Sequence, residues 1–116
     1  WTLRNRPTVE TVLSEDFISL IHKKMFSNVW SWAGNYRLTN KNLGVDYYMI
    51  RQEVRTLTDN CKHWVKNEVF PPDEIANRFK HLLVSIHLYP NGNGRHSRLI
   101  GDILIEAMNG KPFTFC

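Results

Sequence analysis

Residues 90–94, Pro-Asn-Gly-Asn-Gly, interrupt an otherwise helical pattern in the second half of this 116-residue chain. Apolar residues at helical spacing lead up to Ile86, and a second run of this kind starts at Leu99. Proline and the asparagine–glycine pairs disfavour regular structure, so we expect a tight loop between two helices. Glycine carries no Cβ and tolerates positive φ, which lets a ligand approach the loop backbone closely. The fold must therefore contain a helix–loop–helix unit centred on this stretch.

Basic and titratable side chains flank the expected loop. Arg95 and Arg98 are three residues apart, so they share one face at the start of the following helix. The free N–H groups and positive dipole end of a helix N-terminus attract anions at the same place. Taken singly, these features have ordinary explanations: a packed or surface histidine at His87, a common turn and a solvated helix face. Together they indicate a site for a polyphosphate.

Six residues of this stretch carry a resemblance to a known family, and they are His87, Gly92, Asn93, Gly94, Arg95 and Arg98. Their spacing resembles the signature of Fic/Doc proteins, usually H-x-F-x-[D/E]-G-N-G-R-x-x-R. At a usage of roughly 5% per residue type, six fixed positions match by chance about once in 10⁸ starting points, so the combination outweighs the ordinary explanations. Tyr89 takes the aromatic position and Asn91 the acidic one. The stretch is similar to a Fic subgroup found on bacterial mobile elements.

The resemblance implies a protein adenylyltransferase, which moves AMP from ATP onto a Ser, Thr or Tyr hydroxyl of a target protein. His87 would be the catalytic base, a role that suits histidine because its ordinary pKa of about 6.5 lies near neutral pH. Loop N–H groups would form an anion hole, the Asn93 side chain would touch the α-phosphate, and two arginines would hold the β- and γ-phosphates. The nucleotide-binding residues implied are Gly92, Asn93, Gly94, Arg95 and Arg98. The Doc-type kinase variant has lysine at the position of Gly94, whereas this chain has glycine there.

Asn91 departs from the family pattern. The family position normally carries Asp or Glu and binds Mg²⁺, whereas an asparagine carbonyl can bind Mg²⁺ but brings no charge. We therefore expect ATP and Mg²⁺ as the ligands, with Asn91 as a weak metal ligand. Two alternatives stay open: a Fic-type transfer of another nucleotide or phosphate group, and a nucleotide-binding regulatory module whose catalysis Asn91 weakens.

A second part of the resemblance lies at residues 32–37, Trp-Ala-Gly-Asn-Tyr-Arg, which in Fic proteins leads into a β-hairpin called the flap. We expect its strands at residues 36–39 and 43–45. An exposed strand edge can pair with an extended segment of another protein. The target-binding residues implied are Asn42, Leu43, Gly44 and Val45. A hairpin with only a structural role is the alternative that the sequence leaves open.

Hydrophobic periodicity and end signals predict four helices, at residues 15–26, 50–66, 72–86 and 95–108. Ser14 is the expected N-cap of the first helix, and Pro72 the expected start of the third. The residues predicted to face the core include Phe17, Leu20, Ile21, Met25, Val54, Leu57, Cys61, Trp64, Val65, Ile75, Phe79, Leu82, Leu83, Ile86, Leu99, Ile100, Ile103, Leu104 and Ala107, with Trp30 and Trp32 as aromatic anchors.

The predicted fold is mainly α, a Fic-like helical bundle with a small β-hairpin flap. We expect one domain over residues 1–116, with residues 1–13 as an irregular lead-in. The chain starts at Trp1, so we expect a trimmed piece of a longer protein. No apolar run approaches 18 residues, and no membrane-spanning helix is predicted.

Charge and cysteine content indicate which classes of ligand the protein could bind and in which cellular compartment it could lie. The net charge of +4 favours anionic ligands such as ATP, but the positive residues are scattered, so nothing supports nucleic-acid binding. The five histidines show no metal-binding spacing. Two cysteines, Cys61 and Cys116, are too few for a disulfide framework, which favours a cytoplasmic location.

Inhibition of the expected activity is not encoded in a recognisable motif. Autoinhibited Fic proteins carry [S/T]-x-x-x-E-[G/N], and no glutamate of this chain is followed by Gly or Asn. We therefore expect a separate antitoxin-like inhibitor, or flanking residues, to restrain the enzyme. Without such restraint the transferase would be toxic to its host.

Overall fold

The computed structural model describes residues 7–40 and 44–109. Within those residues the regular structure consists of five α-helices and one 3₁₀ turn. The elements are α1 (Val9–Val12), α2 (Glu15–Phe26), η2 (Tyr47–Met49), α3 (Ile50–Lys66), α4 (Pro72–Ile86) and α5 (Asn93–Asn109). The mainly α class predicted from hydrophobic periodicity is confirmed.

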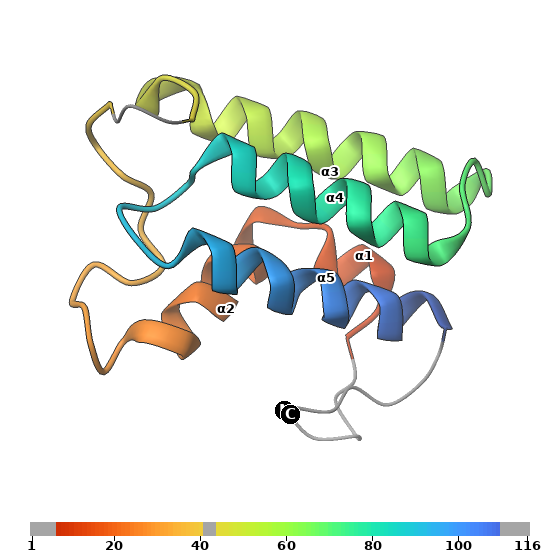
Figure 1. The fold of residues 1–116 in the computed structure, drawn as a ribbon, viewed down its shortest axis with the longest axis horizontal. Helices are drawn as coiled ribbons and strands as arrows, with labels where there is room; N and C mark the ends of the chain where they lie inside the picture. Colours follow the sequence, from red (N-terminus) through yellow and green to blue (C-terminus); the bar gives the residue numbers. More distant parts are fainter. Residues whose placement is uncertain (1–6, 41–43, 110–116) are drawn as a thin grey trace.

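Helix α5 lies at the centre of the arrangement in Figure 1. It packs against α4 on one side and against α1 and α2 on the other, while α3 lies alongside α4. The loop between α4 and α5 (cyan) and the long connection from α2 to α3 (orange to yellow) lie at the same end of the molecule. The helix packing therefore brings residues 36–40 and 44–45 to the signature residues of the loop.

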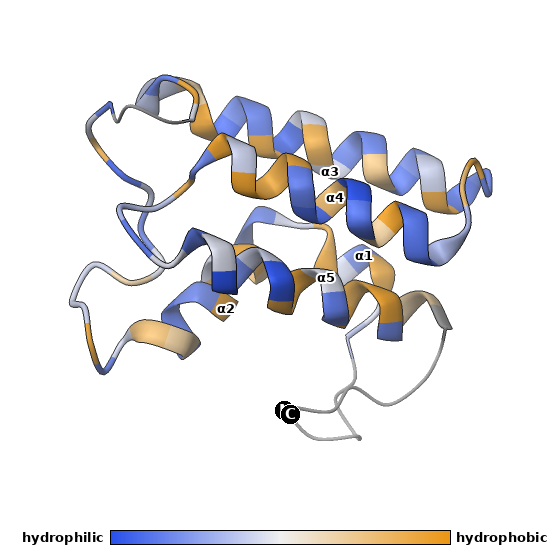
Figure 2. Ribbon diagram, viewed as in Figure 1, coloured by the Kyte–Doolittle hydropathy of each residue, from blue (hydrophilic) through white to orange (hydrophobic). Residues whose placement is uncertain are grey.

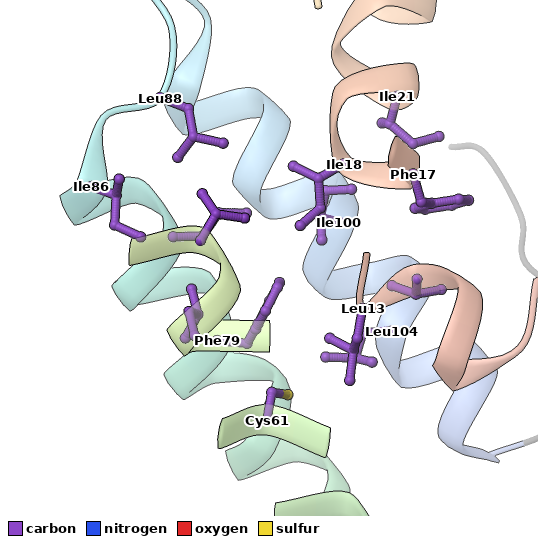
Figure 3. Packing of buried hydrophobic residues seen from close by; sticks show 14 of the residues in the cluster. Leu13, Phe17, Ile18, Ile21, Cys61, Phe79, Ile86, Leu88, Ile100 and Leu104 are labelled. Carbon is purple, nitrogen blue, oxygen red and sulfur yellow. The ribbon is translucent and has the colours of Figure 1, made fainter. Parts of the chain in front are cut away.

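The hydrophobic core fills the space between α5 and its neighbours. Figure 3 shows Ile18 of α2 next to Ile100 of α5, and Cys61 of α3 in the same cluster. All three side chains are at most 1% exposed. Burial raises the pKa of the Cys61 thiol to about 12, so Cys61 is a small core residue and not a reactive thiolate.

The long helices are amphipathic, and this property determines their packing. On α4, Ile75, Phe79, Leu83 and Ile86 recur at spacings of three or four residues, and all four are buried. Figure 2 shows such hydrophobic positions alternating with hydrophilic ones along α3 and α4. Each helix buries one face and leaves the other to solvent. None of the helices in the described residues is long and apolar enough to cross a membrane.

The predicted helix boundaries agree with the structure in three cases. α2 spans Glu15–Phe26 after Ser14, whose side chain accepts a hydrogen bond from the Phe17 N–H and so caps the helix as expected. α3 and α4 also have the predicted bounds, and Pro72 is the first residue of α4. α5 begins at Asn93, two residues before the predicted start.

Three predictions about the core and the N-terminus are wrong. Leu20 is 42% exposed because it lies on the side of α2 away from the buried face, and Leu82 is 46% exposed because it lies at the edge of the buried face of α4. The predicted irregular lead-in contains the short helix α1, which Thr8 caps. Val12 and Leu13 are fully buried against the core. The periodicity of so short a helix is too brief to be read from sequence.

The predicted β-hairpin flap is not found in the described residues. Residues 36–40 and 44–45 contain no strand, and Asn42 and Leu43 lie outside the described part of the chain. The backbone of this segment bonds to the signature loop instead: the Arg37 N–H donates to the Leu88 carbonyl at 2.9 Å, and the Val45 N–H to the Ile86 carbonyl at 3.3 Å. The described part of the segment is therefore held against the end of α4.

Candidate functional site

His87 ends α4 in a left-handed conformation, with φ 60° and ψ 65°. This region is costly for a residue other than glycine, by about 1 to 3 kcal/mol, and it persists only where the surroundings hold the backbone in place. The His87 N–H donates to the Val84 carbonyl at 3.1 Å, which closes the last turn of the helix. The chain thereby turns sharply at the residue that sequence reasoning assigned as the catalytic base.

The buried Arg37 side chain holds this turn from the other side. It is 2% exposed and donates to backbone carbonyls on two segments, namely those of Thr39, Val45, Ile86 and His87. Its Nε–H meets the His87 carbonyl at 2.5 Å. Burial lowers the pKa of Arg37, and the Asp46 carboxylate opposes that shift, so the guanidinium stays charged. Arg37 therefore joins residues 36–40 and 44–45, here called the flap segment, to the C-terminus of α4. Its positive charge also neutralises the unpaired carbonyls at this helix end.

Gly44 packs directly against the Cβ of His87 and the carbonyl of Ile86. Its φ is +92°, and a Cβ at this position would lie 2.6 Å from the His87 Cβ and 2.7 Å from the Ile86 carbonyl oxygen. No side chain fits in such a space. Gly44 was predicted as a target-binding residue, and the structure brings it against the proposed catalytic base.

The Asn93 side chain closes the loop internally. Its Oδ1 accepts from the Tyr89 N–H at 3.0 Å, and its Nδ2 donates to the Tyr89 carbonyl at 2.7 Å. The side chain is 8% exposed. These two bonds shape the loop, and the Asn93 N–H belongs to the first turn of α5. The Nδ2 group carries a second hydrogen, so the contact of this side chain with the α-phosphate stays a prediction.

Aromatic side chains form a floor beneath the loop. Gly92 has φ +80°, and a Cβ there would lie 2.7 Å from the Phe26 ring and 3.2 Å from Trp30. Trp30 stacks on Trp32 at 4.7 Å between ring centroids, and both are half-buried. The guanidinium of Arg95 lies 5.2 Å from the centre of the Phe26 ring. Trp32 packs against the hydrophobic core, as predicted, whereas Trp30 supports the loop at Gly92.

Two histidines and a tyrosine are buried deeper under the same loop. His22 stacks on Tyr89 with 3.7 Å between ring centroids, and His96 lies edge-on to both. His96 Nε2 lies 2.8 Å from the Ile18 carbonyl. Burial lowers the pKa of His96 to about 4 and also lowers the pKa of His22. Both rings are therefore neutral at neutral pH. The burial of His96 gives this residue a structural role.

The loop borders a cavity of about 660 Å³. Its wall consists of the end of α4, the loop, the first turn of α5 and one flap residue, namely Val84, Ser85, His87, Pro90, Asn91, Gly92, Asn93, Gly94, Arg95, Arg98 and Gly44. The cavity thus brings His87, both arginines and the three residues of the predicted anion hole together. Leu43 and Asn42 lie outside the described residues, and Val45 is not in the wall.

The positive charge of this cavity comes from α5. Arg95 and Arg98 are exposed on the first turns of the helix and line the cavity. The N–H groups of Gly94 and Arg95 have no acceptor within their helix, because they belong to its first turn. A Cβ on Gly94 would meet nothing within 4 Å, so this part of the wall is open. The geometry suits an anion with several phosphate groups.

A metal ion finds few ligands in the described wall of the cavity. No aspartate or glutamate is among its lining residues. The Asn91 side chain is exposed, and its Oδ1 accepts from the Gly92 N–H at 2.9 Å. Protein sites for Mg²⁺ normally supply one or two carboxylates beside the phosphates. The residues present therefore do not make a metal site by themselves. Asn91 could contribute only the neutral Oδ1 of its side chain as a metal ligand.

A larger cavity, of about 910 Å³, lies on the other side of the flap segment. Its wall includes Tyr36, Arg37 and Leu38 but none of the signature residues. Glu15 lies in this wall, and its carboxylate accepts a hydrogen bond from the Tyr36 hydroxyl and forms ion pairs with Arg51 and Arg55. Size alone would favour this cavity, but its lining residues include no histidine, and its carboxylates, Glu15 and Asp16, would repel a phosphate. We therefore assign the candidate site to the cavity at His87.

Sequence reasoning missed two residues of this site, His22 and Phe26. Phe26 was the last residue of a predicted helix, and His22 was one of five histidines without metal-binding spacing. Both contact the loop from α2, some 65 residues earlier in the chain. No local pattern signals such a contact, since it depends on how α2 packs against α5.

Comparison with known proteins agrees with the signature residues. A family model described as the Fic/DOC family matches residues 12–105, which include the whole loop and both helices that flank it up to the last turn of α5. Among curated proteins no match was found.

Proposed function

The chain belongs to the Fic/DOC family, and from this premise we propose that it transfers AMP from ATP to a hydroxyl group of a target protein. Members of this family are typically transferases that act on proteins, so a Fic-type transferase is the coarser assignment. The proposal has three finer parts: AMP is the transferred group, ATP is its donor, and a protein side chain is the acceptor.

The observation that carries the proposal is the shared cavity of His87 and the first turn of α5. A phosphoryl centre needs a base on one side and positive charge on the other. His87 supplies the imidazole at the end of α4, while Arg95, Arg98 and the free N–H groups supply the charge. Few structural roles would require this set of residues at one exposed cavity.

In the proposed reaction, His87 accepts the proton of a Ser, Thr or Tyr hydroxyl as its oxygen attacks the α-phosphorus. The new O–P bond forms as the bond between the α-phosphorus and the bridging oxygen breaks, and pyrophosphate leaves with that electron pair. Arg95 and Arg98 hold the β- and γ-phosphates and stabilise the charge that develops on the leaving group. The proton on His87 then passes to solvent.

The position of the flap segment beside His87 suits it to orient the acceptor hydroxyl of a target protein. Gly44 lies against the Cβ of His87, and Arg37 joins this segment to the end of α4. A target chain that pairs with residues 42–45 would therefore present its hydroxyl beside the imidazole. We propose that Mg²⁺ enters with ATP, bound mainly by its phosphates, and no step above depends on a protein-held metal.

Labelled ATP tests the proposal. The protein is incubated with a cell lysate and either α-labelled or γ-labelled ATP, together with a His87→Ala control. We expect α-label on a protein hydroxyl, lost by at least 100-fold in His87→Ala, since a general base contributes about 10² to 10⁴ in rate.

The other outcomes separate the alternatives. Label from γ-labelled ATP alone would mean phosphoryl transfer, and transfer from another labelled nucleotide would mean a different donor. Binding of ATP without any transfer would favour a regulatory module in which Asn91 has weakened catalysis. Steeply salt-dependent affinity for DNA, without transfer, would contradict all three.

A further inference from the structure

His22 makes a hydrogen bond through each nitrogen of its ring, one to the signature loop and one to Gly34. Its Nε2 lies 3.1 Å from the carbonyl oxygen of Asn91, and its Nδ1 lies 3.0 Å from the N–H of Gly34. The side chain is fully buried between Tyr89, Phe26 and Trp32. The ring thus bridges the start of the flap segment and the middle of the signature loop.

The partners determine which nitrogen carries the proton. A backbone N–H can only donate, so Nδ1 must accept from Gly34 with its lone pair. Nε2 faces a carbonyl oxygen, which can only accept, so the proton of the neutral ring is on Nε2. His22 therefore donates to Asn91, and no other neutral form satisfies both contacts.

This bond also orients the next N–H group. The peptide bonds in the described residues are trans, so the carbonyl of Asn91 and the N–H of Gly92 point in opposite directions across their shared plane. Because His22 holds the carbonyl toward the core, the Gly92 N–H points away from the core. The exposed Oδ1 of Asn91, on the cavity side, receives that N–H at 2.9 Å.

We propose that His22 is a positioning residue for phosphate binding: by holding the Asn91 carbonyl inward, it aims the Gly92 N–H at the anion in the cavity. The Asn91 side-chain oxygen takes the place at that N–H that a phosphate oxygen occupies when the nucleotide binds. This inference rests on the proposed nucleotide site and adds a residue from α2 that does not touch the nucleotide.

A matched pair of variants separates this role from simple packing. The amide nitrogen of Gln lies about where Nε2 of histidine lies, so His22→Gln retains the donor to Asn91 and loses the acceptor for Gly34. In His22→Asn the amide oxygen replaces Nδ1, so the acceptor is kept and the donor to Asn91 is lost. Both variants lose the ring that stacks on Tyr89.

The measurements are the Kd for ATP, by titration calorimetry on the full chain, and the thermal midpoint of each variant. We expect His22→Gln to bind ATP within about threefold of wild type and His22→Asn to bind it about tenfold more weakly, the effect of one charge-assisted hydrogen bond. The two thermal midpoints should be similar, since each variant loses one hydrogen bond and the same stacking contact.

A measurement on the wild type alone guards against variants that fail to fold. The amide resonance of Gly92, followed by ¹⁵N–¹H spectra, should shift strongly when ATP saturates the protein. An unmoved Gly92 resonance, or equal ATP affinity in the two folded variants, would overturn the role of His22 and leave the proposed function standing. A wild type that binds no ATP would overturn both.

Discussion

At the scale of single residues, the site is defined by how side chains bond to the loop backbone. The amide of Asn93 ties the loop to Tyr89, Arg37 binds the carbonyl of His87, and His22 holds that of Asn91. Each of these three side chains is at least nine-tenths buried. The loop that faces the phosphates is therefore shaped from beneath by buried side chains, of which only that of Asn93 belongs to a residue of the cavity wall.

Replacing Asn91 by aspartate should strengthen the binding of Mg²⁺ in the cavity. Asn91→Asp restores a carboxylate to a cavity whose described wall has none, and Mg²⁺ prefers charged oxygen ligands. We expect the Mg²⁺ concentration for half-maximal AMP transfer to fall about tenfold or more. Titration of Mg²⁺ at fixed ATP measures it, with Asn91→Ala as the control that lacks any side-chain oxygen. An unchanged midpoint in Asn91→Asp would show that the phosphates alone hold the metal.

His96 should make the fold sensitive to acid. Burial lowers its pKa to about 4 in the folded protein, against about 6.5 unfolded, so the folded state disfavours the extra proton. The groups that face the ring are His22 and the Tyr89 phenol, and neither is an anion that could stabilise a charged His96. Its contribution to stability is thus complete above pH 6.5 and is lost as the pH falls toward 4.

The expected loss between these two pH values is on the order of 3 kcal/mol. Urea unfolding at several pH values measures this free energy, and His96→Gln, which can still donate to the Ile18 carbonyl, should flatten the profile over that range. A variant with the wild-type slope would mean that other groups cause the acid sensitivity.

At the scale of elements, the site lies where two segments meet the ends of two helices. α4 ends and α5 begins at the loop, and Arg37 and Val45 bond to the backbone at the C-terminus of α4. Arg37 and Gly44 make that contact close. This contact replaces the hairpin pairing that the resemblance implied for the described part of the segment.

Glycine substitutions test how closely these elements fit. Gly44→Ala introduces a Cβ 2.6 Å from His87 at a φ of +92°, so we expect a loss of about 2 kcal/mol in stability and a reduced rate of transfer. Gly101→Ala is the matched control, because it lies inside α5 and its Cβ would meet nothing closer than 3.6 Å.

In that control the unfolding free energy should rise by about 0.5 to 1 kcal/mol, since alanine favours a helix interior, while transfer continues. Chemical denaturation and the labelling assay give both quantities. Equal stability of the two variants would mean that the segment at Gly44 can move away from His87 without cost.

At the scale of the whole molecule, the two cavities lie on either side of the flap segment. One contains the base and the phosphate-binding groups, and the other contains Tyr36, Arg51 and Arg55. No glutamate of the sequence lies in the motif of autoinhibited Fic proteins. We therefore propose that a separate antitoxin-like protein or residues outside this chain restrain the activity.

An unrestrained transferase should slow the growth of its host. Expression of this chain in bacteria should reduce the growth rate several-fold relative to His87→Ala expressed at the same level, since the variant keeps the fold but lacks the base. Growth curves with matched protein levels by immunoblot provide the measurement. Equal growth of the two strains would contradict an active and uninhibited enzyme.

The sequence by itself determined the long helices and the chemistry of the loop. Amphipathic spacing predicted the bounds of α2, α3 and α4, because burial of one face is a local and repeating constraint. The cluster from His87 to Arg98 could be recognised because its residues are close in the chain and their spacing is dictated by one loop and one helix turn. These parts of the site needed no knowledge of distant contacts.

Only the tertiary structure decided what lies behind the loop. His22, Phe26 and Arg37 reach it from 50 or more residues away, and the side chain of Asn93 turns inward because Tyr89 offers it two partners. The burial of Leu13 and the exposure of Leu20 likewise depend on where α5 lies. Such contacts arise from the packing of α5 between α2 and α4, and residues that meet through packing share no periodicity in the sequence.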